Sequence, residues 1–464
     1  MPDTLIELSR LIRTREASPV EIARDVLARI ERRNPALNAY LLTTPELAMS
    51  QAEQAEREIA SGQYRGPLHG IPYAAKDLMY TRGIPTTAGT KIFADFVPAY
   101  DATVVEKLRD AGAVLLGKAH LHENAYGITS NNAHYGPVRN PWNLDRIPGG
   151  SSGGSTSALA AGLCAFSLGT DTGGSIRIPA AFCGVTGLKP TFGRISRHGM
   201  FLLGESLDTI GPFAWTAQET AWVYSAMAGP DPADDTTLDA DVELPEFAAE
   251  PRLEGVRLGV PSNFYFESLD SGVDAACGAA LQVFEDLGAE LVPVRVPDIS
   301  EINELHRLIL FVEGAAVHQK TFAEHREDYG EDQRPLFDQG LEIRAVDYFA
   351  AERRRQEFTA EMETVLDDVD ALLAPAVVVP PAPIGAATLD LNGVETDVRA
   401  ATTRNSRGLN LTGLPILTLP CGFTDGLPVG LQIVGQQLAE SQILQIGHAY
   451  QSVTTWHDQR PQEG

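Results

Sequence analysis

The sequence predicts an α/β protein preceded by a helical leader, and three observations support this prediction. From residue 66 onward, short apolar runs bounded by Gly and Pro alternate with helical stretches, which is the rhythm of a sheet covered by helices. Residues 1–65 instead show helical patterns. The chain of 464 residues is 44% hydrophobic and 7% aromatic, which is typical of a globular protein with a sizeable core.

Two helices are well marked in the leader. Ser18-Pro19-Val20-Glu21 places a capping serine, a proline at the first helical position and a glutamate three residues after the cap. A helix should therefore run from this string to about Arg33. A second helix should span residues 45–60, because Gly62 stands just beyond its end. We expect this leader to pack on the larger body of the protein.

The body alternates strands and helices. Apolar runs predict strands over residues 71–75, 114–116, 165–168, 258–260, 290–294, 371–379, 415–419 and 429–434. Helical patterns cover residues 103–111, 156–163, 273–287, 301–326, 348–368 and 441–454. Gly-Leu-Lys-Pro at residues 187–190 predicts a turn. Residues 228–252 are acidic, contain prolines and lack apolar periodicity, so we expect an exposed crossing loop there.

The net charge of −26 argues against two classes of partner. An acidic excess of this size repels phosphate backbones and anionic lipid surfaces, so we expect no contact with nucleic acid or membrane. The four cysteines, at positions 164, 183, 277 and 421, are too scattered for a disulfide framework or a zinc site. The first residues lack the segments of a signal peptide, and no apolar run is long enough to span a membrane. We therefore expect a soluble cytoplasmic protein with buried free thiols.

Residues 149–175 form a Gly-Ser-rich stretch, GGSSGGSTSALAAGLCAFSLGTDTGGS. Glycines at this density let the backbone approach a ligand closely, so its two Gly-Ser clusters suggest a site. Two glycine patterns are chance matches. Residues 112–118 have the spacing of a phosphate-binding loop, but Ala119 stands where Ser or Thr should bind magnesium. Residues 149–153 fit the G-x-S-x-G elbow, but turn-like residues precede them where that motif needs a strand.

In the string GIPYAAKD, Lys76 stands at the end of a short apolar strand, at the point where a sheet commonly opens into a pocket. This string, with NPWNLDRIPGGSSGGSTSALAAG, LGTDTGGSIRIPAAFCGVTGLKPTFGRIS and SLDTIGP, resembles the amidase signature family of serine hydrolases. The resemblance continues through LLAPA, NLTGLP and GLPVGLQIVG, and so covers nearly all of the chain after the leader. Its motifs are long and contiguous, which makes it far more specific than the two chance matches.

The resemblance implies a Ser-Ser-Lys triad without metal or cofactor. Ser175 matches the nucleophile, Lys76 the base, and Ser151 the bridging serine, held by a cis peptide after Gly150. The amides that match the oxyanion hole belong to Thr172, Gly173, Gly174 and Ser175. A serine hydroxyl needs a base to take its proton, and Lys76 must be neutral to act as one, so burial should lower its pKa. Ser151 can relay the proton because a hydroxyl both donates and accepts.

Several nearby residues are expected to play supporting or structural roles. Ser152 and Ser155 should order the relay or cap the following helix, and Asp171 and Arg177 should form an ion pair or bind backbone. Cys183 lies in an apolar context, which argues against a thiol nucleophile. His120, His122 and His134 lack an accompanying set of metal ligands, so we expect ordinary hydrogen-bonded or solvent-facing histidines.

The resemblance also implies the architecture. It predicts one domain with a large mixed central sheet covered by helices on both faces, where the pattern alone supports only α/β. We expect a leader over residues 1–65 and an amidase signature domain over residues 66–464. Within that domain, residues 66–215 hold the motifs, residues 216–403 vary and supply much of the substrate pocket, and residues 404–464 return to the sheet.

The function implied is hydrolysis of the C–N bond of a small-molecule carboxylic amide, with esters or carbamates as further substrates. The alternative is the glutaminase component of a tRNA-dependent amidotransferase, which belongs to the same family. We rank it lower, because Ile178 stands where that component typically carries Gln and residues 340–360 lack its tyrosine-rich string. A non-catalytic binding protein is a third alternative, against which the intact triad argues. The sequence leaves a homodimer open.

Overall fold

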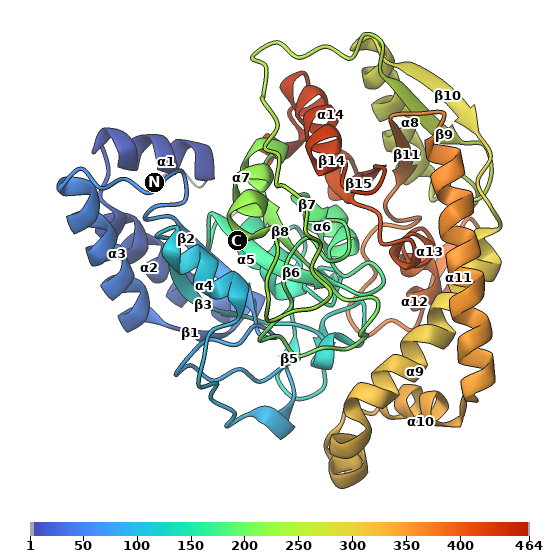
Figure 1. Cartoon of the computed structure of the whole chain (residues 1–464), viewed down its shortest axis with the longest axis horizontal. Coiled ribbons are helices and arrows are strands. Elements are labelled where there is room, and N and C mark those ends of the chain that lie inside the picture. Colours follow the sequence, from blue (N-terminus) through green and yellow to red (C-terminus); the bar gives the residue numbers. More distant parts are fainter. Residues whose placement is uncertain (1–3, 463–464) are drawn as a thin grey trace.

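One mixed sheet of 11 strands runs through the middle of the molecule and is flanked by helices (Figure 1). The structure is a computed structural model and describes residues 4–462. The strand order is β1-β3-β2-β6-β8-β7-β14-β15-β11-β9-β10. In that order the strands span Tyr40–Thr43, Val114–Ala119, Pro72–Lys76, Phe166–Asp171, Thr209–Ala214, Thr186–Lys189, Ile416–Thr424, Leu427–Val434, Ala371–Pro375, Arg257–Pro261 and Glu290–Val294. The predicted α/β class with a large mixed sheet is confirmed.

The α-helices make up most of the regular secondary structure outside this sheet. They are α1 Leu5–Thr14, α2 Pro19–Leu37, α3 Pro45–Ala60, α4 Thr103–Asp110, α5 Gly153–Ala160, α6 Arg177–Cys183, α7 Ala217–Met227, α8 Ser271–Asp286, α9 Ile299–His325, α10 Arg334–Glu342, α11 Ala345–Leu366, α12 Val398–Thr403, α13 Arg407–Leu411 and α14 Glu440–Ser452. Two small hairpins pair β4 Asn131–Asn132 with β5 Gly136–Pro137 and β12 Thr388–Leu391 with β13 Val394–Asp397. Within residues 4–462, no helix is both long and apolar enough to cross a membrane.

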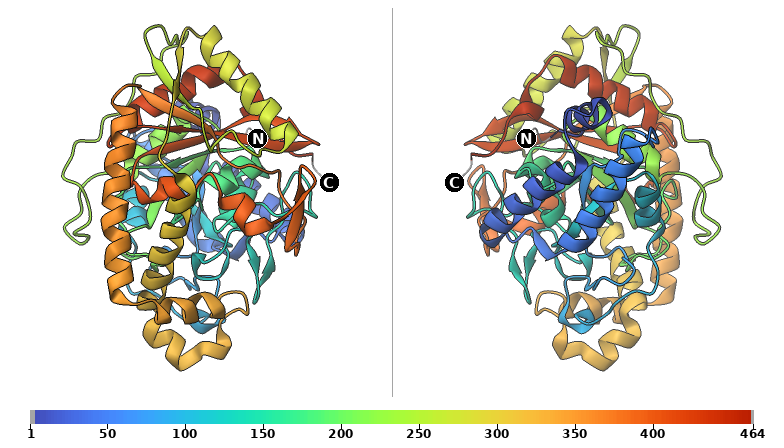
Figure 2. Two further views of the ribbon diagram at one scale, coloured as in Figure 1. Left: turned by 90° about the vertical axis from the view of Figure 1, so that its right-hand side faces the viewer. Right: turned by 90° about the vertical axis from the view of Figure 1, so that its left-hand side faces the viewer.

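Helices pack on both faces of the sheet. Leu417 of β14 contacts Gly447 of α14, whereas the next residue, Thr418, lies beside Gly430, which packs on Ala181 of α6. Because successive strand residues point to opposite faces, α14 and α6 cover opposite sides. The leader helices and the pair α9 and α11 lie at opposite ends of the molecule (Figure 2).

The leader shares the central sheet, which the sequence did not predict. β1 pairs antiparallel with β3 and forms one edge of the sheet. A four-residue strand with a partly exposed side carries too short an alternating pattern to be read from sequence. The capped start of α2 is confirmed, since the Ser18 hydroxyl accepts hydrogen bonds from the amides of Val20 and Glu21.

Several boundaries differ from the predictions. α2 continues beyond Arg33 to Leu37, whose side chain is buried. The expected turn at residues 187–190 lies largely within β7, because pairing with β8 and β14 extends this segment. β8 and α10 were not predicted. Residues 229–256 contain no helix or strand, in agreement with the predicted crossing loop.

The arrangement of β2 and β6 positions the motif residues. These two strands are parallel neighbours, and they end at Lys76 and Asp171. Carboxyl ends of parallel strands meet at one edge of a sheet, where loops collect functional side chains. The Gly-Ser stretch wraps around this edge, because α5 follows Ser152 and packs against both strands.

Candidate active site

Lys76 points into a cage of hydroxyl groups. Its Nζ lies 2.7 Å from Ser151 Oγ, 3.0 Å from Ser152 Oγ and 2.8 Å from Thr170 Oγ1. All of these side chains are buried, and Lys76 itself is 0% exposed. Thr170 lies on β6 beside the end of β2, so strand pairing places its hydroxyl next to the lysine. The sequence predicted the Lys76–Ser151 contact but not the part played by Thr170.

Burial changes the acid–base properties of Lys76. Removal from water lowers the pKa of this amine to about 7, although Asp208 and Asp171 oppose the shift. A buried amine favours its neutral form because the charged form loses hydration. Lys76 is therefore neutral in a substantial fraction of molecules at neutral pH, as a general base requires.

The turn that carries Ser151 is held by a third serine. The Gly150–Ser151 peptide is cis, as the resemblance implied. Ser130 Oγ donates to Gly149 O over 2.9 Å and accepts from the Gly153 amide over 3.1 Å. A Cβ atom at Gly150 would lie 2.9 Å from backbone atoms of Ile128 and Ser130, so only glycine fits there. The turn is thus clamped on both sides of Ser151.

Ser175 occupies a second turn, which packs against the first. A Cβ at Gly149 would lie 2.9 Å from Cα of Pro179, in the helix that follows Ser175. Ser175 is 5% exposed. Its neighbours are fixed by Asp171, whose carboxylate accepts from the Gly174 amide over 2.6 Å and from the Ile176 amide over 3.1 Å. The structure therefore presents Ser175 from a rigid loop beside the Ser151 turn.

Three of the four predicted oxyanion amides remain unoccupied. Within residues 4–462, the N–H groups of Thr172, Gly173 and Ser175 have no protein acceptor. The Gly174 N–H, in contrast, points inward to Asp171. This amide was expected among the oxyanion donors, but the carboxylate already uses it.

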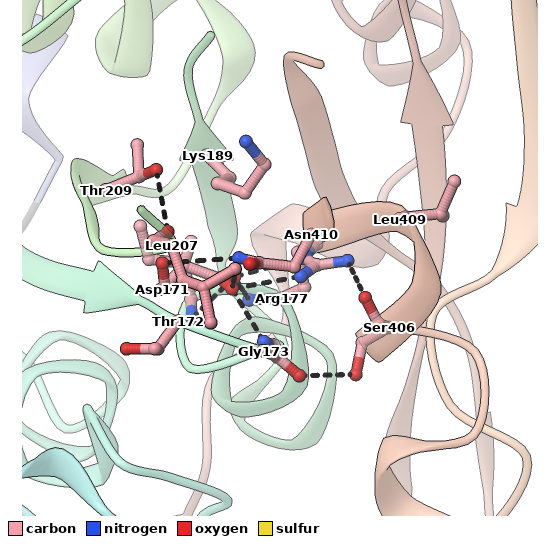
Figure 3. Close-up of polar contacts among 12 residues, drawn as sticks. Asp171, Thr172, Gly173, Arg177, Lys189, Leu207, Thr209, Ser406, Leu409 and Asn410 are labelled. Atoms are coloured by element: carbon pink, nitrogen blue, oxygen red, sulfur yellow. Dashed lines mark hydrogen bonds and ion pairs between the residues drawn. The ribbon is translucent and has the colours of Figure 1, made fainter. Parts of the chain in front are cut away.

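Asp171 is the centre of the buried network drawn in Figure 3. Arg177 Nε and Nη2 donate to its two carboxylate oxygens over 3.0 and 2.9 Å, and Asn410 Nδ2 lies 3.2 Å from Oδ1. Burial alone would raise the pKa of Asp171, but the Arg177 guanidinium, with Lys189 and the Gly174 amide, holds it well below its usual range. The expected ion pair is present, and it supports the Ser175 turn from below.

Further hydrogen bonds to the Ser175 turn come from residues of which only some stand in the motif strings. His306 Nε2 donates to Thr172 O over 2.8 Å, and Ser406 Oγ donates to Gly173 O over 3.0 Å. The Thr172 hydroxyl donates to Asp208. Asp208 and Asn410 stand in the motif strings SLDTIGP and NLTGLP, so those strings held a usable signal. His306 stands in no such string.

The family model described as Amidase matches residues 21–444 of this chain. The chain belongs to the amidase signature family. This match covers the cage around Lys76 and both serine turns, so the resemblance read from the motif strings holds over residues 66–444 of the body. Membership supports an enzyme that acts on C–N bonds of amides.

Relatives of this amidase signature chain fall into two groups. The first group consists of glutamyl-tRNA(Gln) amidotransferase subunits. One from Chloroflexus aurantiacus is 40% identical over 96% of this chain and 95% of its own length. A solved one from Thermotoga maritima is 31% identical, with a TM-score of 0.79 over 94% of this chain and 92% of that one.

The second group consists of other amidase signature structures. One belongs to a vestigial protein complex that reveals the evolutionary origins of an s-triazine catabolic enzyme, with 34% identity and a TM-score of 0.92 over 97% of this chain and 98% of that one. A peptide amidase in complex with the inhibitor chymostatin is 30% identical, with a TM-score of 0.86 over 99% of both chains.

The remaining candidates of this amidase signature chain lie outside the cage. Cys183 is buried, its thiol donates to Pro148 O, and burial raises its pKa to about 12, which removes it as a nucleophile. Ser155 binds a carbonyl of β6. His122 contacts Asp332 and His134 contacts Glu123. Within residues 4–462, no group of three or more His, Cys, Asp or Glu is arranged to hold a metal ion.

Proposed function

We propose that this chain hydrolyses a carboxylic amide through an acyl-enzyme on Ser175. The observation that carries the proposal is the buried contact of 2.7 Å between Lys76 Nζ and Ser151 Oγ. A lysine with a pKa near 7 beside a serine relay is a known alternative to the Ser-His-Asp arrangement.

The first half of the reaction forms the acyl-enzyme, an ester between the Ser175 oxygen and the acyl group of the substrate. Neutral Lys76 takes the proton of Ser151, and Ser151 takes the proton of Ser175 as its oxygen attacks the carbonyl carbon. The amides of Thr172, Gly173 and Ser175 are the donors left for the developing oxyanion. One such donor contributes about 3–4 kcal/mol to stabilising the transition state. Collapse breaks the C–N bond, and the leaving nitrogen receives the proton back through Ser151.

The second half releases the acid. Water attacks the acyl carbon while the same relay removes its proton, and Ser175 leaves with a proton from Ser151. Both halves use Lys76 alternately as base and acid, which its pKa near neutrality permits. Every proton in this scheme moves among Lys76, Ser151, Ser175, the substrate and water.

A second candidate is the glutaminase component of a tRNA-dependent amidotransferase. The curated relatives support this candidate better than they support a free-standing amidase, since amidotransferase subunits from Chloroflexus aurantiacus and Hahella chejuensis are each 40% identical over nearly the whole chain. The TM-score to the peptide amidase, 0.86 against 0.79 for the Thermotoga maritima subunit, and Ile178 at the position typical of Gln favour a free-standing amidase. The neighbour with a TM-score of 0.92 belongs to a protein complex and does not favour a free-standing enzyme. Both candidates share the chemistry at Ser175.

A fluorophosphonate probe tests the shared chemistry. We expect it to label the wild type, and we expect no label on Ser175→Ala or Lys76→Met. Folded wild-type protein that resists the probe and hydrolyses no amide in a panel of aryl, aliphatic and peptide amides would refute the enzyme proposal. Glutamine-dependent ammonia release that requires a co-purifying tRNA-binding partner would establish the glutaminase candidate instead.

A further inference from the structure

Three arginines from separate helices gather around Tyr126. Arg399 of α12 donates from Nη2 to Tyr126 O over 3.3 Å. Arg307 of α9 places its guanidinium carbon 5.4 Å from the ring centre of Phe311, and that ring lies 6.3 Å from the Tyr126 ring. Arg407 begins α13, which packs on α9 where the Gly408 amide donates to Asn303 Oδ1 over 2.9 Å.

Two of these arginines directly follow, in sequence, residues that donate hydrogen bonds to the Ser175 turn. Arg307 follows His306, which donates to Thr172 O, and Arg407 follows Ser406, which donates to Gly173 O. Arg177 Nη1 fixes Ser406 further by donating to its carbonyl over 2.8 Å. The cluster therefore lies next to the residues that support the Ser175 turn, and the charge of Arg407 acts on His306, which contacts that turn.

The acidic partners of the cluster are unevenly distributed. Glu304 lies 3.0 Å from Arg307, and Asp332 and Asp397 attract Arg399. The Arg407 guanidinium, in contrast, has no hydrogen bond or ion pair with any residue between 4 and 462, although the charge of Glu304 attracts it. Burial, Arg399 and Arg307 together lower the pKa of Arg407 to about 9. Although the protein carries 62 acidic residues, none of those described forms an ion pair with this guanidinium.

Two buried polar atoms beside the cluster also lack partners. The Tyr126 hydroxyl and His306 Nδ1 are buried without a hydrogen bond in the described part of the chain, and Tyr126 is 1% exposed. Burial and the charge of Arg407 lower the pKa of His306 to about 3, so this ring is neutral and adds no charge. Unpaired buried polar groups are uncommon in native proteins and call for a ligand or another explanation.

We propose that Arg407, with Arg399 and Arg307 around it, binds a carboxylate of the amide substrate. The substrates would then be amides that carry a second, ionised acid group, such as the monoamides of short dicarboxylic acids. This inference rests on the proposed amide hydrolysis at Ser175 and specifies its substrate class. An arginine fork binds a carboxylate through two charge-assisted hydrogen bonds, and the bound anion would supply the charge that Arg407 lacks.

Glutamine is itself an amide with a carboxylate, so its binding needs a separate prediction. It also carries an ammonium group, which a cluster of positive charges repels. We therefore expect glutaramate, which is glutamine without the ammonium group, to be the better substrate of the two.

Paired substrates test the proposal. The kcat/KM of malonamate, succinamate and glutaramate is measured beside that of the neutral amides propanamide, butanamide and pentanamide. We expect at least one anionic amide to exceed its neutral counterpart by about 10-fold or more. The variant Arg407→Gln should lose about 10- to 100-fold on that substrate, the range for hydrogen bonds to a charged group. Its kcat/KM on the neutral amides should fall by a smaller factor than on the anionic substrate.

Two further variants serve as controls. Arg407→Lys keeps the charge but not the fork, so it should retain part of the preference. Arg353→Gln removes an exposed arginine on α11 and should leave the preference unchanged. Labelling of Ser175 by fluorophosphonate provides a readout without turnover: malonate, succinate or glutarate should slow labelling of the wild type and not of Arg407→Gln.

The outcomes separate this inference from the proposed function. A wild type that is labelled but prefers neutral amides, or an Arg407→Gln variant that loses equally on both substrate sets, overturns the inference and leaves amide hydrolysis intact. If the panel contains no substrate, protection from labelling decides: Arg407-dependent protection supports the carboxylate site, and its absence refutes it. Folded wild type without labelling or turnover refutes both.

Discussion

Replacing Asp171 by Asn should disturb both the stability and the reactivity of the enzyme. The carboxylate is fully buried and binds Arg177 through both oxygens. It also accepts hydrogen bonds from the backbone amides of Gly174 and Ile176. An Asn side chain has nearly the same shape, but it has only one acceptor oxygen. Whichever way it is oriented, its NH2 group faces one Arg177 donor and one backbone donor. The variant therefore removes a charge and creates donor-to-donor contacts on one side.

The magnitude follows from the burial of the pair. Arg177 is 0% exposed, so Asp171→Asn leaves a guanidinium in the interior without its counter-charge. Breaking a buried ion pair in this way costs about 3–5 kcal/mol. Because the same carboxylate fixes the amides on both sides of Ser175, we also expect slower fluorophosphonate labelling of the fraction that remains folded.

Thermal unfolding and labelling rates, measured on the same samples, check this prediction. A clear fall of the unfolding midpoint at pH 7 should accompany slower labelling. The matched control is Asp347→Asn, which removes a carboxylate from an exposed pair with Arg344 and should change neither measurement. A midpoint and a labelling rate equal to those of the wild type would refute the role assigned to Asp171.

The pH dependence of this effect has a defined sign. The pKa of Asp171 lies below its usual range in the folded protein, so the ionised pair stabilises the fold above the unfolded pKa of about 4. That stabilisation is lost as the pH falls through the folded pKa. The difference between wild type and Asp171→Asn should thus be full at neutral pH and shrink in strong acid. A combined Asp171→Asn and Arg177→Met variant should cost less than the sum of the single changes.

Further predictions concern the cage and the turns. Because Lys76 must be neutral to act as base and its pKa is about 7, kcat/KM should rise between about pH 6 and 8 and then level; a flat profile would contradict the role of Lys76. Thr170→Val removes one of the three hydroxyl groups that accept hydrogen bonds from Lys76. It should shift the midpoint of that pH profile while the protein stays folded. Gly150→Ala should prevent labelling of Ser175, because its Cβ would meet backbone at 2.9 Å; circular dichroism distinguishes a blocked site from an unfolded chain. Cys183→Ala should be labelled at the wild-type rate, since the thiol is buried and protonated.

Local features were readable from the sequence because they depend on neighbouring residues. The cap at Ser18 and the bounds of residues 45–60 and 290–294 agree with the structure, since capping, helical period and β-branched runs are properties of short segments. The contiguous Gly-Ser strings likewise marked Ser151 and Ser175, and GIPYAAKD marked Lys76.

Contacts between distant segments were decided only by the tertiary structure. Pairing of β1 with β3 and the placement of Thr170 beside Lys76 depend on strand neighbours, which no local pattern specifies. His306 reaches Thr172 across 134 positions, and the inward Gly174 amide depends on where the Asp171 carboxylate sits. The sequence by itself thus marked the residues that we propose to react. The tertiary structure decided how these residues are positioned, through the pairing of β2 with β6 and the contacts of His306 and Ser406 with the Ser175 turn. Those contacts join segments that are distant in the chain, so neighbouring residues do not specify them.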